Sequence, residues 1–109
     1  MRITVSGKQV DLSDALRTRV AEQLEVIERK YFQRAMDAHV TFGRERSFFT
    51  CDIEVHAGHN LFYRGRSEAP LANAALDSAV EHVGKQLRRY RRRVNEHGRA
   101  AGQEAFAAA

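Results

Sequence analysis

The chain has 109 residues, a formal net charge of +4 and an isoelectric point near 9.7. Its 43% hydrophobic and 29% charged residues are typical of a single globular domain. No segment approaches the ~20 apolar residues of a membrane-spanning helix, and a single cysteine, Cys51, excludes a disulfide within the chain. We therefore expect a cytoplasmic protein that does not bind a membrane.

The first part of the chain predicts a strand followed by a helix. Polar and apolar residues alternate over residues 2–6, which is the period of a strand. Ser13 is a favourable N-cap for a helix of about five turns. The apolar residues of this helix recur at a spacing of three or four: Leu16, Val20, Leu24, Ile27 and Tyr31.

Three strands are expected in the middle of the chain. Residues 38–43 and 49–57 alternate, and a turn at residues 58–60 leads to a further strand at residues 61–67. Three such consecutive strands predict an antiparallel meander.

A second, long helix is predicted from Pro70 to Asn95, because Pro suits the first turn of a helix and Gly98 favours its end. Its apolar positions again have helical spacing: Leu76, Val80, Val83, Leu87, Tyr90 and Val94. From Gly98 onward the chain is rich in Ala and Gly and has no periodicity. We expect a domain over residues 1–97 and a disordered tail or the start of a linker over residues 98–109.

The order β-α-β-β-β-α predicts the α+β class, with a four-stranded sheet and both helices packed on one of its faces. The apolar stripes of the helices and the inner face of the sheet then supply the core. The other face is expected to be polar and to carry Arg2, Thr4, Thr41, Asp52, Glu54, Arg64 and Arg66.

The most informative segment is the basic run, residues 85–93, which holds six positive charges and no acid in nine residues. The first 60 residues, by contrast, hold nine basic and nine acidic side chains. A merely solvated helix face usually interleaves acids at a spacing of three or four, and arginine is favoured where phosphates are bound. The basic run therefore predicts a nucleic-acid-binding surface formed by Lys85, Arg88, Arg89, Arg91, Arg92 and Arg93.

Other arginines are open to two interpretations. Arg64 and Arg66 either extend the cationic surface around the sheet or protect an edge strand against aggregation. Arg44 and Arg46, in the turn between two strands, are weaker candidates for contact with a nucleic acid.

Little in the sequence supports catalysis or a bound metal. His56 and His59 form a pair without a nearby third metal ligand. Cys51 alternates in phase with the inward-facing residues of its predicted strand, so it is expected in the core. Phe48 and Phe49 are candidates for stacking on a base, although one of the two must face the core. Paired catalytic carboxylates, a phosphate-binding glycine loop and a Ser-His-Asp arrangement are not evident. We therefore expect that the chain is not an enzyme and that it binds no metal, no other cofactor and no small-molecule substrate.

Three segments carry a resemblance to one known family: ITVSGKQVDLSDALR at residues 3–17, AALD at residues 74–77 and KQLRRYRRRVNEH at residues 85–97. They are similar to the N-terminal domain of the bacterial ribosome hibernation promoting factors, also called ribosome-associated inhibitor A or sigma-54 modulation proteins. The likeness covers residues 2–97. The motifs at the two ends are fairly specific, whereas the middle of the chain matches in pattern only.

The resemblance implies a fold like the double-stranded-RNA-binding domain and a translation inhibitor that binds the small ribosomal subunit. The implied site is the channel for messenger RNA and the A- and P-site transfer RNAs, and the implied partner is the subunit's rRNA. Translation would be inhibited by occlusion, as suits ribosome hibernation under stress or in stationary phase. By position, the family's RNA-contacting residues correspond to the cations of the basic run, with Lys8, Arg64 and Arg66 as weaker counterparts.

The chain departs from the family pattern just before AALD, where Leu71 and Asn73 stand in place of an Asp and a Tyr. Some family members carry a second, dimerising domain after a linker, so the chain fits both a short form and the first domain of a longer parent protein. We expect the isolated chain to be monomeric. Two alternative functions stay open: a generic double-stranded-RNA-binding module, and a protein adaptor that docks an acidic partner.

Overall fold

The computed structural model describes residues 2–31, 36–57 and 62–101. They form four strands and two helices in the predicted order: β1 (Arg2–Gly7), α1 (Asp14–Tyr31), β2 (Met36–Glu45), β3 (Phe48–Ala57), β4 (Phe62–Ala69) and α2 (Ala72–Ala101). The turn expected at residues 58–60 lies outside the described residues, and so does the tail from residue 102 onward.

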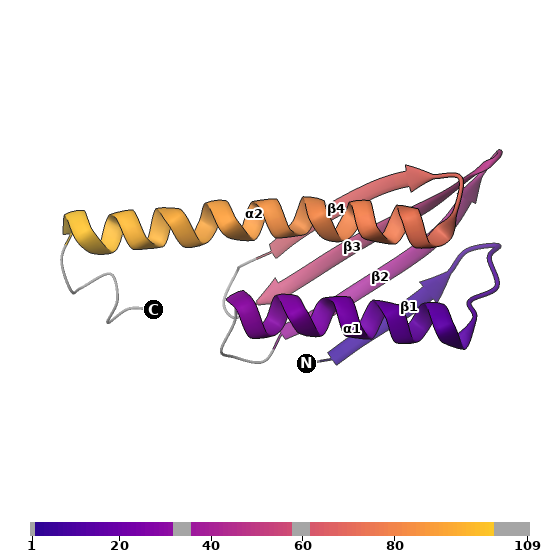
Figure 1. Cartoon of the computed structure of the whole chain (residues 1–109), viewed down its shortest axis with the longest axis horizontal. Helices are drawn as coiled ribbons and strands as arrows, with labels where there is room; N and C mark the ends of the chain where they lie inside the picture. The colour runs from indigo at the N-terminus through magenta and orange to yellow at the C-terminus, as the bar shows by residue number, and fades with distance from the viewer. Residues whose placement is uncertain (1, 32–35, 58–61, 102–109) are drawn as a thin grey trace.

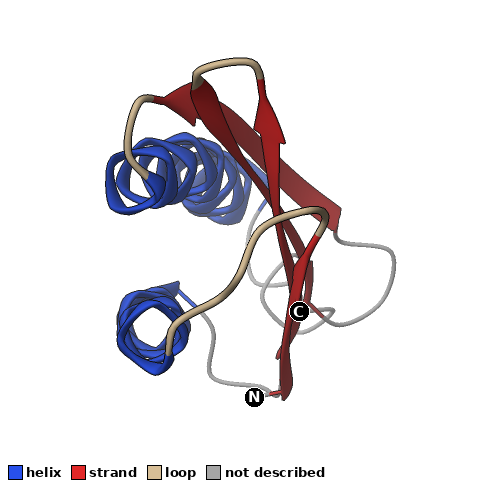
Figure 2. Ribbon diagram, turned by 90° about the vertical axis from the view of Figure 1, so that its right-hand side faces the viewer, coloured by secondary structure: helices blue, strands red, loops and turns tan. Residues whose placement is uncertain are grey.

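The strands form one sheet in the order β1-β2-β3-β4. β2, β3 and β4 are antiparallel neighbours, which confirms the predicted meander. β1 runs parallel to β2, because α1 carries the chain back along one face of the sheet before β2 begins. Both helices lie on that same face (Figure 2), so the predicted α+β architecture is confirmed.

The core lies between the two helices and the inner face of the sheet. Each buried large side chain contributes roughly 1.5–3 kcal/mol, so this layer is the main source of stability. The described residues of the predicted stripes are buried as expected, except that Val80 and Tyr90 are only partly covered; the side chains of Tyr31 and Val94 lie outside the described part of the structure. The large buried side chains are Leu16, Val20, Leu24, Ile27, Val40, Phe42, Ile53, Val55, Leu76, Val83 and Leu87.

The two helices begin differently. Ser13 caps α1 as predicted, because its Oγ accepts a hydrogen bond from the backbone N–H of Leu16 at 3.1 Å. The expected start of α2 at Pro70 is wrong: the first helical bond runs from the N–H of Ala75 to the carbonyl of Leu71 at 3.0 Å, so Pro70 precedes the helix. Leu71 therefore occupies the N-cap position with a side chain that has no acceptor atom and is 67% exposed.

Replacing Leu71 with Asp is expected to stabilise the protein. The carboxylate would accept a hydrogen bond from the first turn of α2, which contains no acidic residue, and such a cap contributes about 0.5–2 kcal/mol. Urea unfolding measures the gain, with Leu71→Ala as the control because alanine supplies no acceptor. Equal stabilities of the two variants would contradict the assignment of Leu71 as the N-cap.

The expected end of α2 at Asn95 is also wrong. The helix continues through Gly98 to Ala101, and in Figure 1 its C-terminal part extends well past the end of the sheet. A glycine inside a helix costs only ~1 kcal/mol relative to alanine, so Gly98 need not end it. The division into a domain of residues 1–97 and a tail of residues 98–109 stays a prediction.

Candidate nucleic-acid interface

The basic run lies on α2 with its apolar residues inward and its cations outward. Leu87, in the middle of the run, is 1% exposed and packs in the core. Lys85, Arg88, Arg89 and Arg92 are all exposed, as the helical period predicts. Arg91 and Arg93 also belong to α2, but their side chains lie outside the described part of the structure. A buried stripe thus fixes the helix while its guanidinium groups face solvent.

Ion pairing leaves most of these described cations available. Lys85 lies 3.6 Å from Glu81 one turn earlier, and both side chains are more than half exposed, so the pair is weak. Among the side chains that the structure describes, Arg88, Arg89 and Arg92 have no acidic partner. Within the described part of the structure, the positive charge of these three arginines is therefore not neutralised by the fold itself.

Two side chains of α2 bind the backbone of β4, the strand at the edge of the sheet. The amide of Gln86 accepts from the N–H of Arg64 at 3.2 Å and donates to the carbonyl of Arg64 at 2.6 Å. His82 Nδ1 lies 3.0 Å from the carbonyl of Arg66. These groups occupy hydrogen-bonding positions that a further strand would use, so the edge is covered by α2. The basic run consequently lies alongside β4.

Gly65 makes this close approach possible. A Cβ at this position would lie 2.6 Å from the carbonyl oxygen of Ala79 and 2.8 Å from Val83 Cγ2, so any larger residue would push α2 away from the strand.

Sequence reasoning missed Gly65, Gln86 and His82 as determinants of the interface. A glycine inside a strand is a known sign of close backbone approach and was the available indication; nothing in the sequence alone points to Gln86 or His82.

The predicted residues Arg64 and Arg66 point to the opposite, outer face of the sheet. The guanidinium of Arg64 makes two hydrogen bonds to Asp52, from Nε at 3.0 Å and from Nη2 at 2.5 Å. The pair holds the pKa of the Asp52 carboxyl below its usual value. Glu54 lies 3.8 Å from the same guanidinium. The positive charge of Arg64 is thus largely balanced by these two carboxylates of the sheet.

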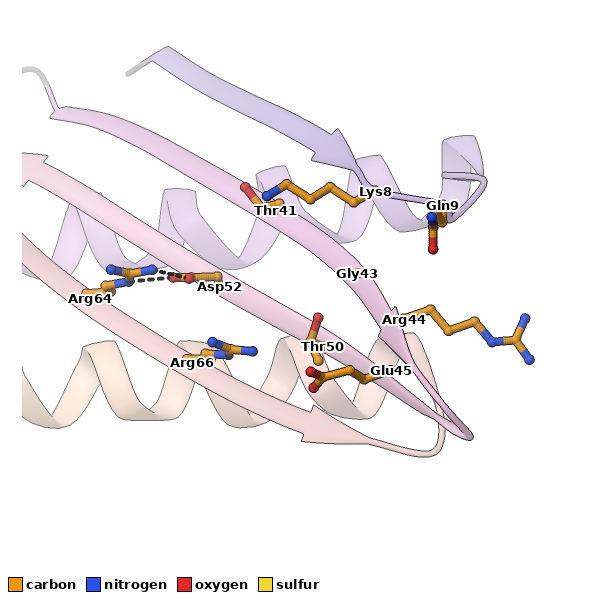
Figure 3. Close-up of a pocket in the computed structure, with 10 residues that line it drawn as sticks. All are labelled: Lys8, Gln9, Thr41, Gly43, Arg44, Glu45, Thr50, Asp52, Arg64 and Arg66. Carbon is orange, nitrogen blue, oxygen red and sulfur yellow. Dashed lines mark hydrogen bonds and ion pairs between the residues drawn. The ribbon is translucent and has the colours of Figure 1, made fainter.

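Lys8 joins the two arginines around an open hollow on this outer face. Figure 3 shows Lys8, Thr41, Asp52, Arg64 and Arg66 lining it, with the Arg64–Asp52 hydrogen bonds dashed. The structure therefore gathers the three weaker candidates in one place. That place is separated from the basic run by the β4 edge, and acidic side chains contribute to it.

Arg44 and Arg46 lie near the β2–β3 turn, away from the basic run. Arg44 was predicted in the turn, which is wrong: it belongs to β2 and pairs with Phe49 of β3. The guanidinium of Arg44 sits 5.5 Å from the centroid of the Phe49 ring, a cation–π contact that covers one candidate stacking residue. Phe48 remains 45% exposed. Arg46 adopts a positive φ of 57° and so forms part of the turn itself.

α1 and α2 are joined by the aspartate of the AALD segment. Arg19 Nη2 donates to both carboxylate oxygens of Asp77 at 2.9 Å, and Gln23 Nε2 donates to one of them at 2.6 Å. Because these groups are about half exposed, their contribution to stability is small. Their effect is to orient the two helices relative to each other.

Chemistry other than binding finds little support in the described residues. Cys51 is fully buried, and burial raises the pKa of its thiol to about 12, with the Asp52 carboxylate as a smaller cause. Its predicted place in the core is confirmed. Among the described residues no group of three or more His, Cys, Asp or Glu side chains is arranged to hold a metal ion. None of the described helices has the length and apolarity to cross a membrane.

Comparison with known proteins decides the family. The profile of the family described as sigma 54 modulation protein / S30EA ribosomal protein matches residues 3–95. The chain belongs to this family. The resemblance seen in the three sequence segments is thereby confirmed, and the match includes the whole basic run.

Several relatives within the family are named for ribosome hibernation. The ribosome hibernation promotion factor of Rhizobium meliloti (strain 1021) is 33% identical over 103 residues, which cover 94% of this chain and 54% of the relative. The ribosome hibernation promoting factor of Escherichia coli K12 is 24% identical, covering 89% of this chain and all of the relative. The chain spans about half the length of the rhizobial relatives, including that of Bradyrhizobium diazoefficiens.

Solved structures support the same family fold. The N-terminal domain of Thermus thermophilus Protein Y superposes with a TM-score of 0.75 at 25% identity, covering 83% of this chain and 99% of that one. A ribosomal subunit interface protein from Coxiella burnetii gives a TM-score of 0.73 at 22% identity, covering 84% and 98%. The latter likeness concerns the fold alone.

Proposed function

We propose that this chain is the ribosome-binding domain of a hibernation factor. It binds the small ribosomal subunit in the channel for messenger RNA and the A- and P-site transfer RNAs, and it inhibits translation by occlusion. Its partner is the subunit's rRNA, and it acts in the cytoplasm, in stationary phase or under stress. Membership of the S30EA family and the names of the curated relatives support a role on the ribosome.

One observation carries the proposal that binding is to RNA. Three arginines, Arg88, Arg89 and Arg92, are exposed on a helix that the core fixes in place, and no described acid neutralises them. Guanidinium groups held on a rigid support bind phosphates without the entropic cost of ordering a loose chain. Lys85, Arg91 and Arg93 complete this group in the proposal.

A second, weaker group consists of Lys8, Arg64 and Arg66 on the outer face of the sheet. Its placement on the other side of β4 suits a domain that touches several walls of a channel. Because Asp52 already engages Arg64, we rank these contacts below those of α2.

The proposed mechanism is steric and requires neither catalysis nor a cofactor. Basic side chains hold rRNA phosphates while the folded body fills the volume that messenger and transfer RNA need. In this proposal the isolated chain acts as a monomer. Pairing of two ribosomes is a separate activity that would require a second contact surface.

Competition on the small subunit tests the occlusion mechanism. Purified small subunits that carry messenger RNA and P-site initiator transfer RNA are expected to exclude the fluorescently labelled chain, because one volume cannot hold both. Empty subunits are expected to bind it. Simultaneous binding of the chain and P-site transfer RNA would overturn occlusion.

The same labelled chain separates the two alternative functions. A generic double-stranded-RNA-binding module would bind free duplexes as well as it binds subunits, with an affinity that grows with duplex length. A protein adaptor would keep its partner in a pull-down after nuclease treatment, whereas an rRNA-binding factor would lose it.

A further inference from the structure

An exposed aromatic pair lies on the outer face of the sheet, at the start of β4. His56 and Phe62 are direct neighbours on β3 and β4. Their ring centroids are 4.3 Å apart and the ring planes differ by 5°, so one face of Phe62 rests on the imidazole. Phe62 is nevertheless 69% exposed. Its other face is therefore a flat apolar surface held in a fixed orientation and open to solvent.

The basic run lies along β4, the strand that carries Phe62. Along β4, His82 binds the backbone of Arg66 and Gln86 binds that of Arg64, while the Tyr90 ring meets the Tyr63 ring edge-on at 5.9 Å. α2 thus follows β4 in the antiparallel direction, with its later residues nearer the start of the strand (Figure 1).

Arg89 lies on the flank of α2 that borders this edge. It follows Gln86 by three residues and His82 by seven, which is the spacing of side chains on one side of a helix. Its exposed guanidinium is therefore carried to the level of Tyr63, the immediate neighbour of Phe62. Phe62 on the outer face of the sheet and Arg89 on α2 therefore lie toward the same edge of the sheet, near the start of β4.

We propose that Phe62, backed by His56, is a stacking platform for an unpaired nucleobase of RNA, and that Arg89 binds a phosphate next to that base. The inference rests on the proposed RNA-binding function and adds an unpaired nucleotide as the element recognised. A nucleotide combines a flat π surface with an adjacent negative charge, which matches the ring and the guanidinium. Stacking on exposed sheet aromatics is a common way of binding single-stranded RNA.

Phe48 provides a matched control within the same chain. It is also an exposed phenylalanine of the sheet, 45% accessible, but it lies at the opposite end of β3 from His56. The flank of α2 that carries Arg89 is correspondingly distant from it. Phe48→Leu and Phe62→Leu remove the same aromatic ring and keep an apolar side chain of similar size.

The probe is a short single-stranded RNA with one 2-aminopurine near its centre, compared with a blunt duplex of the same sequence. On binding the wild-type chain, the 2-aminopurine fluorescence is expected to be quenched by stacking. Phe62→Leu should abolish the quench and weaken single-strand binding by about 5- to 150-fold, the effect of one lost base–aromatic stack. Its affinity for the duplex should not change, and Phe48→Leu should behave as wild type in every assay.

Each other outcome counts against the proposal in a distinct way. An unchanged quench and affinity for Phe62→Leu, with normal RNA binding by the wild type, would overturn the platform alone. An equal loss of single-strand and duplex binding, with an unchanged thermal melt, would show that Phe62 acts without recognising an unpaired base. A wild-type chain that binds neither RNA would overturn the platform together with the proposed function.

Discussion

Replacing Arg88, Arg89 and Arg92 together with glutamate is expected to abolish RNA binding and leave the fold intact. The three side chains point away from the core, so their reversal removes phosphate contacts without disturbing packing. If about six phosphates are neutralised by the wild type, the slope of log affinity against log salt is near −4 to −5. Fluorescence anisotropy on a model RNA measures both quantities, and single Arg→Ala changes should each make the slope shallower by about one.

The matched control reverses three other exposed arginines, Arg2, Arg17 and Arg29. Both triple variants change the formal net charge from +4 to −2, because each Arg→Glu substitution changes it by two. Arg2 lies on β1, and Arg17 and Arg29 lie on α1, where acidic residues are interleaved. We expect the control to keep most of the affinity. A similar loss in both variants, or a wild-type slope close to zero, would contradict a role specific to the basic run.

Leu87→Ala is expected to cost about 2–5 kcal/mol of stability, because it leaves a cavity beneath the centre of the basic run. Leu87 is 1% exposed although its neighbours in sequence, Gln86 and Arg88, are not buried. Denaturant unfolding followed by circular dichroism measures the change in the free energy of unfolding.

Leu71→Ala and Arg88→Ala are the controls for this experiment. Leu71 undergoes the same substitution at a position that is 67% exposed, and its effect should stay within about 0.5 kcal/mol. Arg88→Ala should cost little stability and mainly weaken RNA binding. Equal stabilities of Leu87→Ala and Arg88→Ala would mean that the helix faces the sheet with a different side.

The fold was predictable because burial is periodic in this sequence. The strand at residues 49–57 alternates without interruption, and the stripe through Val83 and Leu87 has the spacing of a helix. The ends of α2 were predicted wrongly, and so was the end of the strand at residues 38–43, which extends as β2 to Glu45. The sequence predicts limits at Pro70 and Asn95, but helix ends depend on which carbonyls accept the terminal hydrogen bonds, and these follow from the packing of the whole element.

The candidate site was only partly predictable. The outward direction of Arg88 and Arg89 followed from the helical period alone. The separation of Arg64 and Arg66 from the basic run did not, because it depends on the β4 edge lying between them and on Asp52 pairing with Arg64. Such contacts join side chains that are distant in sequence, so they depend on the register in which the strands pair. The amino-acid composition does not determine that register.

Sedimentation of the chain with separated ribosomal subunits tests the central claim most directly. At low salt the wild-type chain is expected to travel with the small subunit and not with the large one. The variant with glutamate at positions 88, 89 and 92 is expected to stay at the top of the gradient. A wild-type chain that stays at the top, or travels with the large subunit alone, would contradict the account.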